Sequence, residues 1–153
     1  PQFQMVIDLH LLNRNWGVII PRLAEAFGLF MARQFFIAIP DELIEAAKLD
    51  GAGHFRTFWS VVLPLAKPLI ASLIIFTFML RWNEFVWPLI VTNSSSKYTI
   101  QVGLAMLKNE LAMSCEWGML MAATVITILP VLIFLIIAQK YIIKGISLTG
   151  LKG

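Results

Sequence analysis

Residues 117–138 read WGMLMAATVITILPVLIFLIIA, and this stretch contains no Asp, Glu, Lys or Arg. About 20 helical residues cross the ~30 Å hydrocarbon core of a bilayer. The stretch therefore predicts a membrane span at residues 117–139, kinked or loosened at Pro130. A helix buried in a soluble protein suits it poorly, because such helices are shorter and this chain is too small to cover one of this length.

The composition agrees with that prediction. The chain of 153 residues is 59% hydrophobic, with a mean hydropathy of +0.81, whereas soluble domains are about 45–50% apolar. We expect an all-α, polytopic transmembrane helical bundle. The chain begins at Pro1 without the features of a signal peptide, so residues 1–153 are expected to be the C-terminal part of a longer transmembrane domain. A single Cys115 leaves the redox compartment undecided.

A second candidate span, residues 16–36, carries charge within its apolar sequence. Arg22 and Glu25 are three residues apart, which would place them on one helical face. Charged side chains at membrane depth are costly and normally face a protein interior or a water-filled path. The pair can contact a solute or hold helices together as an internal ion pair, and the ion pair is the favoured interpretation.

The third candidate span, residues 66–91, has a polar interruption at Asn83 and Glu84. A polar notch in an otherwise apolar helix is typical of a transport path. These side chains can hydrogen-bond the hydroxyls of a solute, stabilise the wall of the path or contact an external protein. The sequence leaves these three roles open.

Residues 37–65, between these two spans, differ in character because charges are frequent. Asp41 is expected to cap a helix whose first turn is acidic. The Gly51-Ala52-Gly53 run ends that helix, and a second one is expected from His54 to Val62, ended by Leu63-Pro64. Its aromatic face suits a groove on another protein or a lipid surface. Docking onto a protein is favoured, because the acidic first half is repelled by an anionic leaflet.

Residues 92–116 are predicted to be an external loop and residues 140–153 a tail. Cytoplasmic segments carry an excess of Lys and Arg. The side that holds residues 37–65 and the tail has seven such residues and the other side has three. The seven are Arg33, Lys48, Arg56, Lys67, Lys140, Lys144 and Lys152, and the three are Arg14, Lys97 and Lys108. The charge difference places residues 37–65 and the C-terminus in the cytoplasm.

A spaced pattern lies inside residues 37–65. Glu45-Ala46-Ala47 is followed after three residues by Gly51, and after nine more by Val61, one residue and Leu63-Pro64. This pattern resembles the EAA signature of the permease subunits of ABC importers. The run WNEFVWPL at residues 82–89 resembles the carbohydrate group of that family. Val102-Gly103-Leu104 and the Lys152-Gly153 ending resemble the second permease of maltose-type and glycerol-phosphate-type systems.

The resemblance implies a multi-pass permease subunit in a bacterial inner membrane, with sugars as the expected solutes. It implies an ABC ATPase dimer, a second permease subunit and an extracytoplasmic solute-binding protein as partners, and the lipid bilayer as surroundings. The ATPase-coupling positions that it carries over are Glu45, Ala46, Ala47, Asp50, Gly51, Leu63 and Pro64. In that comparison Glu45 makes a polar contact to the ATPase, the two alanines allow close approach, and Gly51 forms a tight turn. The candidate path-lining residues are Arg22, Glu25, Asn83 and Glu84.

Other kinds of site are not expected. His10 and His54 have no second ligand at metal spacing. Gly51 and Gly53 lack the spacing and the Lys-Ser/Thr ending of a phosphate-binding loop, so ATP is expected to bind and be hydrolysed on another chain. We find no catalytic nucleophile–base set and no basic stripe for nucleic acid. The chain is therefore not expected to be an enzyme or to carry a cofactor.

Two other classes of protein stay open at this point. An ATP-independent secondary transporter or channel explains the polar spans but not the spaced EAA pattern, and an inverted repeat of these spans would favour it. A structural or assembly subunit of a membrane complex has no transport path, so it predicts that Arg22, Glu25, Asn83 and Glu84 have no role in uptake.

Overall fold

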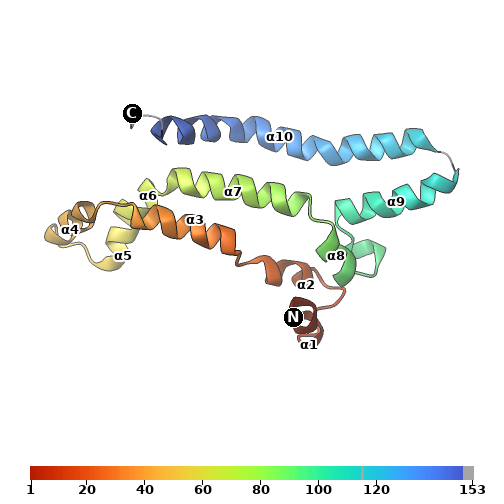
Figure 1. Cartoon of the computed structure of the whole chain (residues 1–153), viewed down its shortest axis with the longest axis horizontal. Helices are drawn as coiled ribbons and strands as arrows, with labels where there is room; N and C mark the ends of the chain where they lie inside the picture. Colours follow the sequence, from red (N-terminus) through yellow and green to blue (C-terminus); the bar gives the residue numbers. More distant parts are fainter. Residues whose placement is uncertain (115, 150–153) are drawn as a thin grey trace. The chain divides into compact units, whose positions relative to one another are not determined.

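The structure is a computed structural model that describes the backbone of residues 1–114 and 116–149, and the side chains of these residues except 112–114 and 140–149. Every regular element in these residues is helical (Figure 1), which confirms the all-α expectation. The elements are, in order, α1 Gln2–Asp8, α2 Asn15–Ile19, the 3-10 turn η1 Ile20–Arg22, α3 Ala26–Ile37, α4 Asp41–Leu49, α5 His54–Thr57, the π-helical turn η2 Phe58–Val62, α6 Leu63–Leu65, α7 Lys67–Trp82, α8 Val86–Val91, the 3-10 turn η3 Ser95–Lys97, α9 Ile100–Ser114 and α10 Trp117–Thr149.

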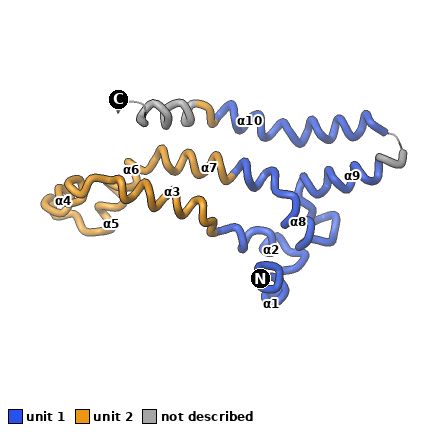
Figure 2. The backbone as a smooth tube through the Cα atoms, in the orientation of Figure 1, with its two compact units in different colours: residues 1–23, 78–137 blue, residues 24–77, 138–153 orange. Residues whose placement is uncertain are grey.

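The chain divides into two compact units (Figure 2). Unit 1 contains residues 1–23 and 78–137, and unit 2 contains residues 24–77 together with the chain from residue 138 onward. Helices α7 and α10 each contribute residues to both units.

The core of unit 1 forms where α1, α2 and α8 meet. Val6, Trp87 and Val91 are buried there, and Leu11 and Val18 pack against them. A residue from each of three short helices is needed to make this cluster. The short helices are therefore stabilised by their mutual packing, since isolated helices of this length are marginal in water.

Gly17 lies against the chain that precedes it in the core of unit 1. A Cβ atom at this position would lie 2.3 Å from the backbone oxygen of Leu11. The indole Nε1 of Trp87 donates a hydrogen bond to the Gly17 carbonyl over 3.2 Å. The close approach of α2 to its neighbours therefore depends on a residue without a side chain.

Asn13 joins the N-terminal loop of unit 1 to the segment after α8. Its Oδ1 accepts hydrogen bonds from the backbone N–H groups of Asn93 and Ser94, both at 3.2 Å, and from the Ser94 hydroxyl at 2.8 Å. Its own N–H donates to the Val91 carbonyl over 2.8 Å. Asn13 has a φ of 55°, a left-handed conformation that asparagine tolerates better than most residues.

The C-terminal end of α7 packs on α10 within unit 1. The Trp82 indole Nε1 donates a hydrogen bond to the Thr127 carbonyl over 3.2 Å. The Phe78 ring stacks on Phe134, with 3.9 Å between the ring centroids. Helix α10 continues through Pro130 without a break in its helical assignment.

In unit 2, α3 and the first part of α7 run side by side (Figure 1). The rings of Phe27 and Phe76 meet edge to face, with 5.9 Å between their centroids. A Cβ atom at Gly28 would meet Leu73 at 3.8 Å, an ordinary contact distance. The two helices therefore meet through side chains, with an aromatic pair directly beside the glycine.

Within the described residues, one helix is long and apolar enough to cross a membrane by itself, namely Trp117–Gln139 within α10. Two more spans are possible if each bent pair of helical segments counts as one, Asn15–Ile37 with Asp41–Leu49 and His54–Leu65 with Lys67–Trp82, and both pairs bend by 67°. The span boundaries and the sides of the membrane that we inferred from sequence stay predictions.

The second and third candidate spans are not continuous helices. The chain leaves regular helix after Arg22 and resumes at Ala26, and it leaves helix again between Trp82 and Val86. Pro21 accounts for the change from α-helix to the 3-10 turn η1 just before the first interruption, because its ring clashes with the preceding turn and it has no N–H to donate. The second interruption falls at the polar notch seen in the sequence.

Other local expectations need correction. Residues 92–116 contain the 15-residue helix α9, because Ile100, Leu104 and Leu107 recur at helical spacing among the polar residues. The N-cap of α4 is Pro40, and Asp41 is the first helical residue, with no side-chain capping hydrogen bond.

The C-terminal ends of two elements also differ from expectation. The helix that we expected to end at Val62 continues through Pro64 to Leu65, because the π-helical turn η2 loosens the helix just before the proline. The expected tail begins as helix, since α10 runs to Thr149, and residues 150–153 lie outside the described residues.

Candidate functional site

The segment of residues 41–64, called the EAA segment below, turns tightly between α4 and α5. The Gly51 N–H donates to the Lys48 carbonyl over 3.0 Å, and the Ala52 N–H donates to the Ala47 carbonyl over 2.9 Å. This is the Schellman arrangement that ends helices on a left-handed residue. Gly51 is that residue, with a φ of +76° and nothing within 4 Å of a Cβ placed there. The need for glycine at this turn is therefore conformational rather than steric.

Large apolar side chains project from this turn into open space. Leu49, directly before it, is 89% exposed, and Phe55, directly after it, is 84% exposed. Trp59 is 63% exposed and meets Phe58 edge to face. Large exposed apolar side chains near one turn indicate a site of contact with a protein or a membrane.

The signature residues divide into an outer and an inner set. Glu45, Ala46, Asp50, Gly51 and Pro64 are exposed, whereas Leu63 is half-buried and Ala47 is buried. Helix α4 packs on α5 and η2, so Ala47 serves the packing of the EAA segment itself. Of the two alanines expected to allow close approach to a partner, Ala46 is the one at the surface.

A charged cluster lies in unit 1, where α7 breaks before α8. The Arg22 Nη2 atom contacts Glu84 Oε1 and the Arg81 Nη1 atom contacts Glu84 Oε2, both at 2.5 Å. The two oxygens of one carboxylate therefore each bind a different arginine, which gives two charge-assisted hydrogen bonds. Arg22 and Glu84 both stand at interruptions of helix, the first in η1 and the second between α7 and α8.

The Trp87 ring packs against the Arg22 guanidinium. The guanidinium carbon of Arg22 lies 5.3 Å from the centroid of the Trp87 ring, within the range of a cation–π contact. In the described part of the chain, the Arg22 Nε atom is buried without a hydrogen-bond partner. The Arg22 side chain is 26% exposed, so its guanidinium is held by Glu84 and Trp87 but is not sealed from the surroundings.

Asn83 and Glu25 are the other two candidate path residues. Asn83 is exposed and its Nδ2 donates to the Met79 carbonyl of α7 over 2.8 Å. Glu25 stands at the N-cap of α3 and belongs to unit 2. Arg22 forms an ion pair with Glu84. The helix that would align Arg22 with Glu25 is interrupted between them, and the pairing of these two residues stays a prediction.

Arg81 also belongs to the cluster, although it is not among the path-lining residues expected from the sequence. It lies three residues before Glu84, and that spacing brings side chains together on a helix. The spacing therefore predicts the contact between Arg81 and Glu84. No comparable signal links Arg22 to Glu84, because the two are distant in sequence.

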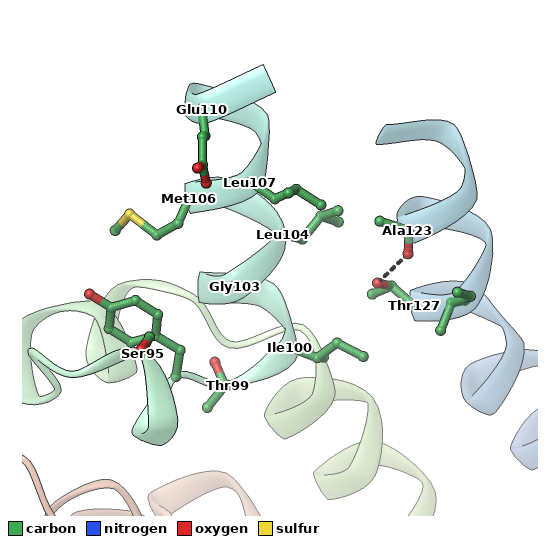
Figure 3. A pocket seen from close by; sticks show the side chains of 12 residues that line it. Ser95, Thr99, Ile100, Gly103, Leu104, Met106, Leu107, Glu110, Ala123 and Thr127 are labelled. Carbon is green, nitrogen blue, oxygen red and sulfur yellow. Dashed lines mark hydrogen bonds between the residues drawn. The ribbon is translucent and has the colours of Figure 1, made fainter. Parts of the chain in front are cut away.

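A groove of about 490 Å³ lies between α9 and α10 in unit 1 (Figure 3). Leu104 and Leu107 of α9 point toward Ala123 and Thr127 of α10. The Thr127 hydroxyl donates a hydrogen bond to the Ala123 carbonyl over 2.8 Å. The Thr99 Oγ1 atom at its edge is buried and has no hydrogen-bond partner in the described part of the chain. The groove is mainly apolar and contains none of the predicted site residues.

Among the described residues, no group of three or more His, Cys, Asp or Glu side chains is arranged to hold a metal ion. Cys115 lies outside the described residues.

The comparisons with known proteins agree with the resemblance seen in the sequence. Residues 5–148 match the family described as binding-protein-dependent transport system inner membrane component. The sn-glycerol-3-phosphate transport system permease protein UgpE of Yersinia pestis is 36% identical over 146 residues, which are 95% of this chain and 52% of that protein. The protein of the same name from Brucella abortus is 35% identical over 146 residues, with the same coverage.

A solved structure gives the same result for the fold. It is described as a bacterial ABC transporter involved in the import of the acidic polysaccharide alginate, and it matches with a TM-score of 0.80 and 29% identity. The match covers 92% of this chain and 55% of that chain. The chain thus spans about half the length of the curated relatives it matches.

These findings confirm the predicted fold class, a polytopic helical membrane domain of the ABC importer permease type. They also confirm the resemblance to the glycerol-phosphate-type permeases. Since the family model matches nearly the whole sequence, the chain belongs to the family of binding-protein-dependent transport system inner membrane components.

Proposed function

We propose that this chain is part of the permease subunit of an ATP-binding-cassette importer for sugars or their acidic derivatives. It contributes helices to the translocation path and couples to a separate ATPase through the EAA segment. It lies in the inner membrane, with the EAA segment and the C-terminus in the cytoplasm. Family membership and the likeness to a solved importer support this proposal.

The observation that carries the coupling role is the exposed apolar surface around the left-handed turn at Gly51. Leu49 and Phe55 flank the turn and are almost fully exposed. An apolar projection on a rigid turn fits a hydrophobic groove on a partner and presents its side chains at little entropic cost. Glu45, Ala46 and Asp50 surround it as polar or small exposed residues, which suits the rim of a docking surface.

The proposed solute class rests on the relatives. Their names concern glycerol 3-phosphate, and the solved importer concerns the acidic polysaccharide alginate. We extend a carbohydrate-related solute to this chain on that basis. Arg22, Glu25, Asn83 and Glu84 are the proposed path-lining residues, since polar groups within membrane spans mark the route of a solute.

The remaining partners follow from the same proposal. ATP hydrolysis is assigned to an ABC ATPase dimer, because this sequence has no phosphate-binding loop. A second permease subunit completes the path within the bilayer. An extracytoplasmic binding protein delivers the solute. Closure of the ATPase dimer is then converted through the EAA segment into movement of the spans.

The test is co-purification of the full-length subunit that contains this chain from detergent-solubilised membranes, as wild type and as Gly51→Leu. We expect the wild type to retain an ATPase subunit and the variant to lose it, while both insert into the membrane in equal amounts. Leucine at this position opposes the left-handed turn without meeting any neighbouring atom. Absence of an ATPase from an intact wild-type complex would overturn the proposal and favour an ATP-independent transporter.

A further inference from the structure

Glu84 is shared between two arginines, and this sharing leaves Arg22 with only part of its hydrogen-bonding capacity used. A guanidinium has five N–H donors and can bind an oxyanion through two of them at once. Glu84 reaches the Nη2 atom of Arg22 through one oxygen, and its other oxygen is held by Arg81. The Arg22 Nε donor is buried and unmet within the described part of the chain.

The cluster is positioned where a solute can reach it. The side chains of Arg22 and Arg81 are 26% and 27% exposed, and that of Glu84 is 15% exposed. Arg22 lies in the 3-10 turn after Pro21, and Glu84 lies in the break between α7 and α8. Backbone outside regular helix is tolerated at membrane depth only where it is covered by protein or lines a water-filled cavity.

We propose that Arg22 is the anion-recognition residue of the transport path. It binds a phosphate or carboxylate group of the solute in exchange for Glu84. This inference rests on the proposed function and narrows its solute class to anions, because neutral sugars offer no oxyanion to make the exchange.

The exchange keeps every charge paired. Without solute, Glu84 contacts both Arg22 and Arg81, so each arginine has an opposite charge beside it, and an isolated charge inside the membrane would be costly. When an anionic solute binds Arg22, Glu84 keeps its second contact to Arg81 and so is not left unpaired. The Trp87 ring remains under the guanidinium in both states and holds its plane in place. Glu84 thus acts as a built-in competitor of the solute.

A solute and a lipid headgroup can both supply a phosphate, and the proposal commits to the solute. The test uses the complete importer in nanodiscs of phosphatidylcholine, which has no net negative charge. The probes are radiolabelled glycerol 3-phosphate and its neutral counterpart, glycerol. The variants are Arg22→Gln, Arg22→Lys and Glu84→Gln. Arg14→Gln is the control, since Arg14 is exposed and outside the cluster.

We expect saturable binding of glycerol 3-phosphate and no saturable binding of glycerol. Arg22→Gln should raise the Kd about tenfold or more, because a charge-assisted hydrogen bond is lost. Arg22→Lys should raise it less, since the charge remains but the planar fork does not. Glu84→Gln should lower the Kd, because the competing carboxylate is gone. Arg14→Gln should leave it unchanged.

The opposite signs expected for Arg22→Gln and Glu84→Gln separate recognition from a purely structural ion pair. If both substitutions weaken binding, or if the wild type binds both probes alike, the proposal is wrong. If Arg22→Gln leaves probe binding unchanged but reduces the phosphatidylglycerol that co-purifies from native membranes, the occupant is a lipid and the proposal is also wrong. Should the Glu84→Gln complex fail to assemble, Glu84→Asp replaces it, since the shorter carboxylate reaches Arg22 less well and is likewise expected to lower the Kd.

Retention of the ATPase is measured in each preparation. Loss of the ATPase from the wild type would contradict the proposed function. An intact complex that retains the ATPase but makes no distinction between the two probes would contradict only the role of Arg22.

Discussion

The Trp87 indole nitrogen donates a hydrogen bond to the backbone carbonyl of Gly17 across 70 positions of sequence, over 3.2 Å. The same indole ring supports the Arg22 guanidinium. Trp87 therefore connects the core of unit 1 to its charged cluster. A substitution at Gly17 is expected to shift the Trp87 ring and so to change the position of the Arg22 guanidinium.

Gly17→Ala is expected to destabilise unit 1. The new Cβ would lie 2.3 Å from the Leu11 carbonyl oxygen, so the backbone must shift. The expected cost is about 2 kcal/mol, as for other overpacked positions. Thermal unfolding of the full-length subunit in detergent measures it. The matched control is Gly103→Ala in α9, where nothing lies within 4 Å and a gain of about 0.5–1 kcal/mol is expected. Equal melting temperatures for both variants would contradict the close packing at Gly17.

Trp87→Phe is expected to keep most of the apolar packing but to lose the hydrogen bond to Gly17. The cost should be about 1 kcal/mol for the hydrogen bond, with a smaller loss from the weaker cation–π contact. Trp16→Phe serves as control, because Trp16 is largely exposed and carries no such contact in the described structure. Chemical denaturation of both variants checks this, and a larger effect at Trp16 than at Trp87 would refute it.

Substitutions of Asn13 should separate its side chain from its backbone. Asn13→Asp keeps the oxygen that accepts from Asn93 and Ser94, so little change in stability is expected. Asn13→Gly keeps only the freedom for a left-handed φ, and Asn13→Ala loses both properties, at about 1–3 kcal/mol. The expected order of melting temperature is Asn and Asp, then Gly, then Ala. An alanine variant as stable as the aspartate variant would show that the side-chain acceptor contributes nothing.

Two glycines of the EAA segment give a matched pair. A Cβ at Gly51 or at Gly53 meets nothing within 4 Å, but Gly51 has a φ of +76° and Gly53 one of −70°. Gly51→Ala should therefore strain the turn by about 1 kcal/mol, whereas Gly53→Ala should not. Uptake per ATP hydrolysed by the reconstituted importer is the measurement, and we expect it to fall for the first variant alone. A loss of coupled uptake in both variants would mean that the turn at residues 51–53 tolerates no added atom, whatever its backbone conformation.

The sequence was sufficient for the features that depend on local spacing. The apolar stretch at residues 117–138 and the overall composition predict an all-α membrane protein, and the spaced EAA pattern predicts the family. Both predictions are confirmed. The break at Asn83 and Glu84 also lies where the polar notch is seen.

The features that were missed depend on contacts between distant residues or on a pattern read too coarsely. Helical spacing related Arg22 to Glu25, but Pro21 and the interruption after Arg22 remove the continuous helix that this spacing assumes. The ion pair of Arg22 with Glu84 joins η1 to the break between α7 and α8, and a single sequence carries no signal for it. Helix α9 could have been predicted from the sequence, because its apolar residues recur at helical spacing among the polar residues that suggested a loop.

The unequal apolarity of the spans has a consequence for biosynthesis. Trp117–Gln139, with a mean hydropathy of 2.9, is the one helix in the described ranges that passes as a span by itself. The earlier segments pass only as bent pairs, and charges such as Arg22 weaken their partition into lipid. Helix α10 is also the last of the described helices to emerge from the ribosome. Its contacts with Trp82 and Phe78 then provide a partner for a span that inserts weakly alone. The earlier described segments therefore gain a strongly apolar partner within the membrane once α10 has been made.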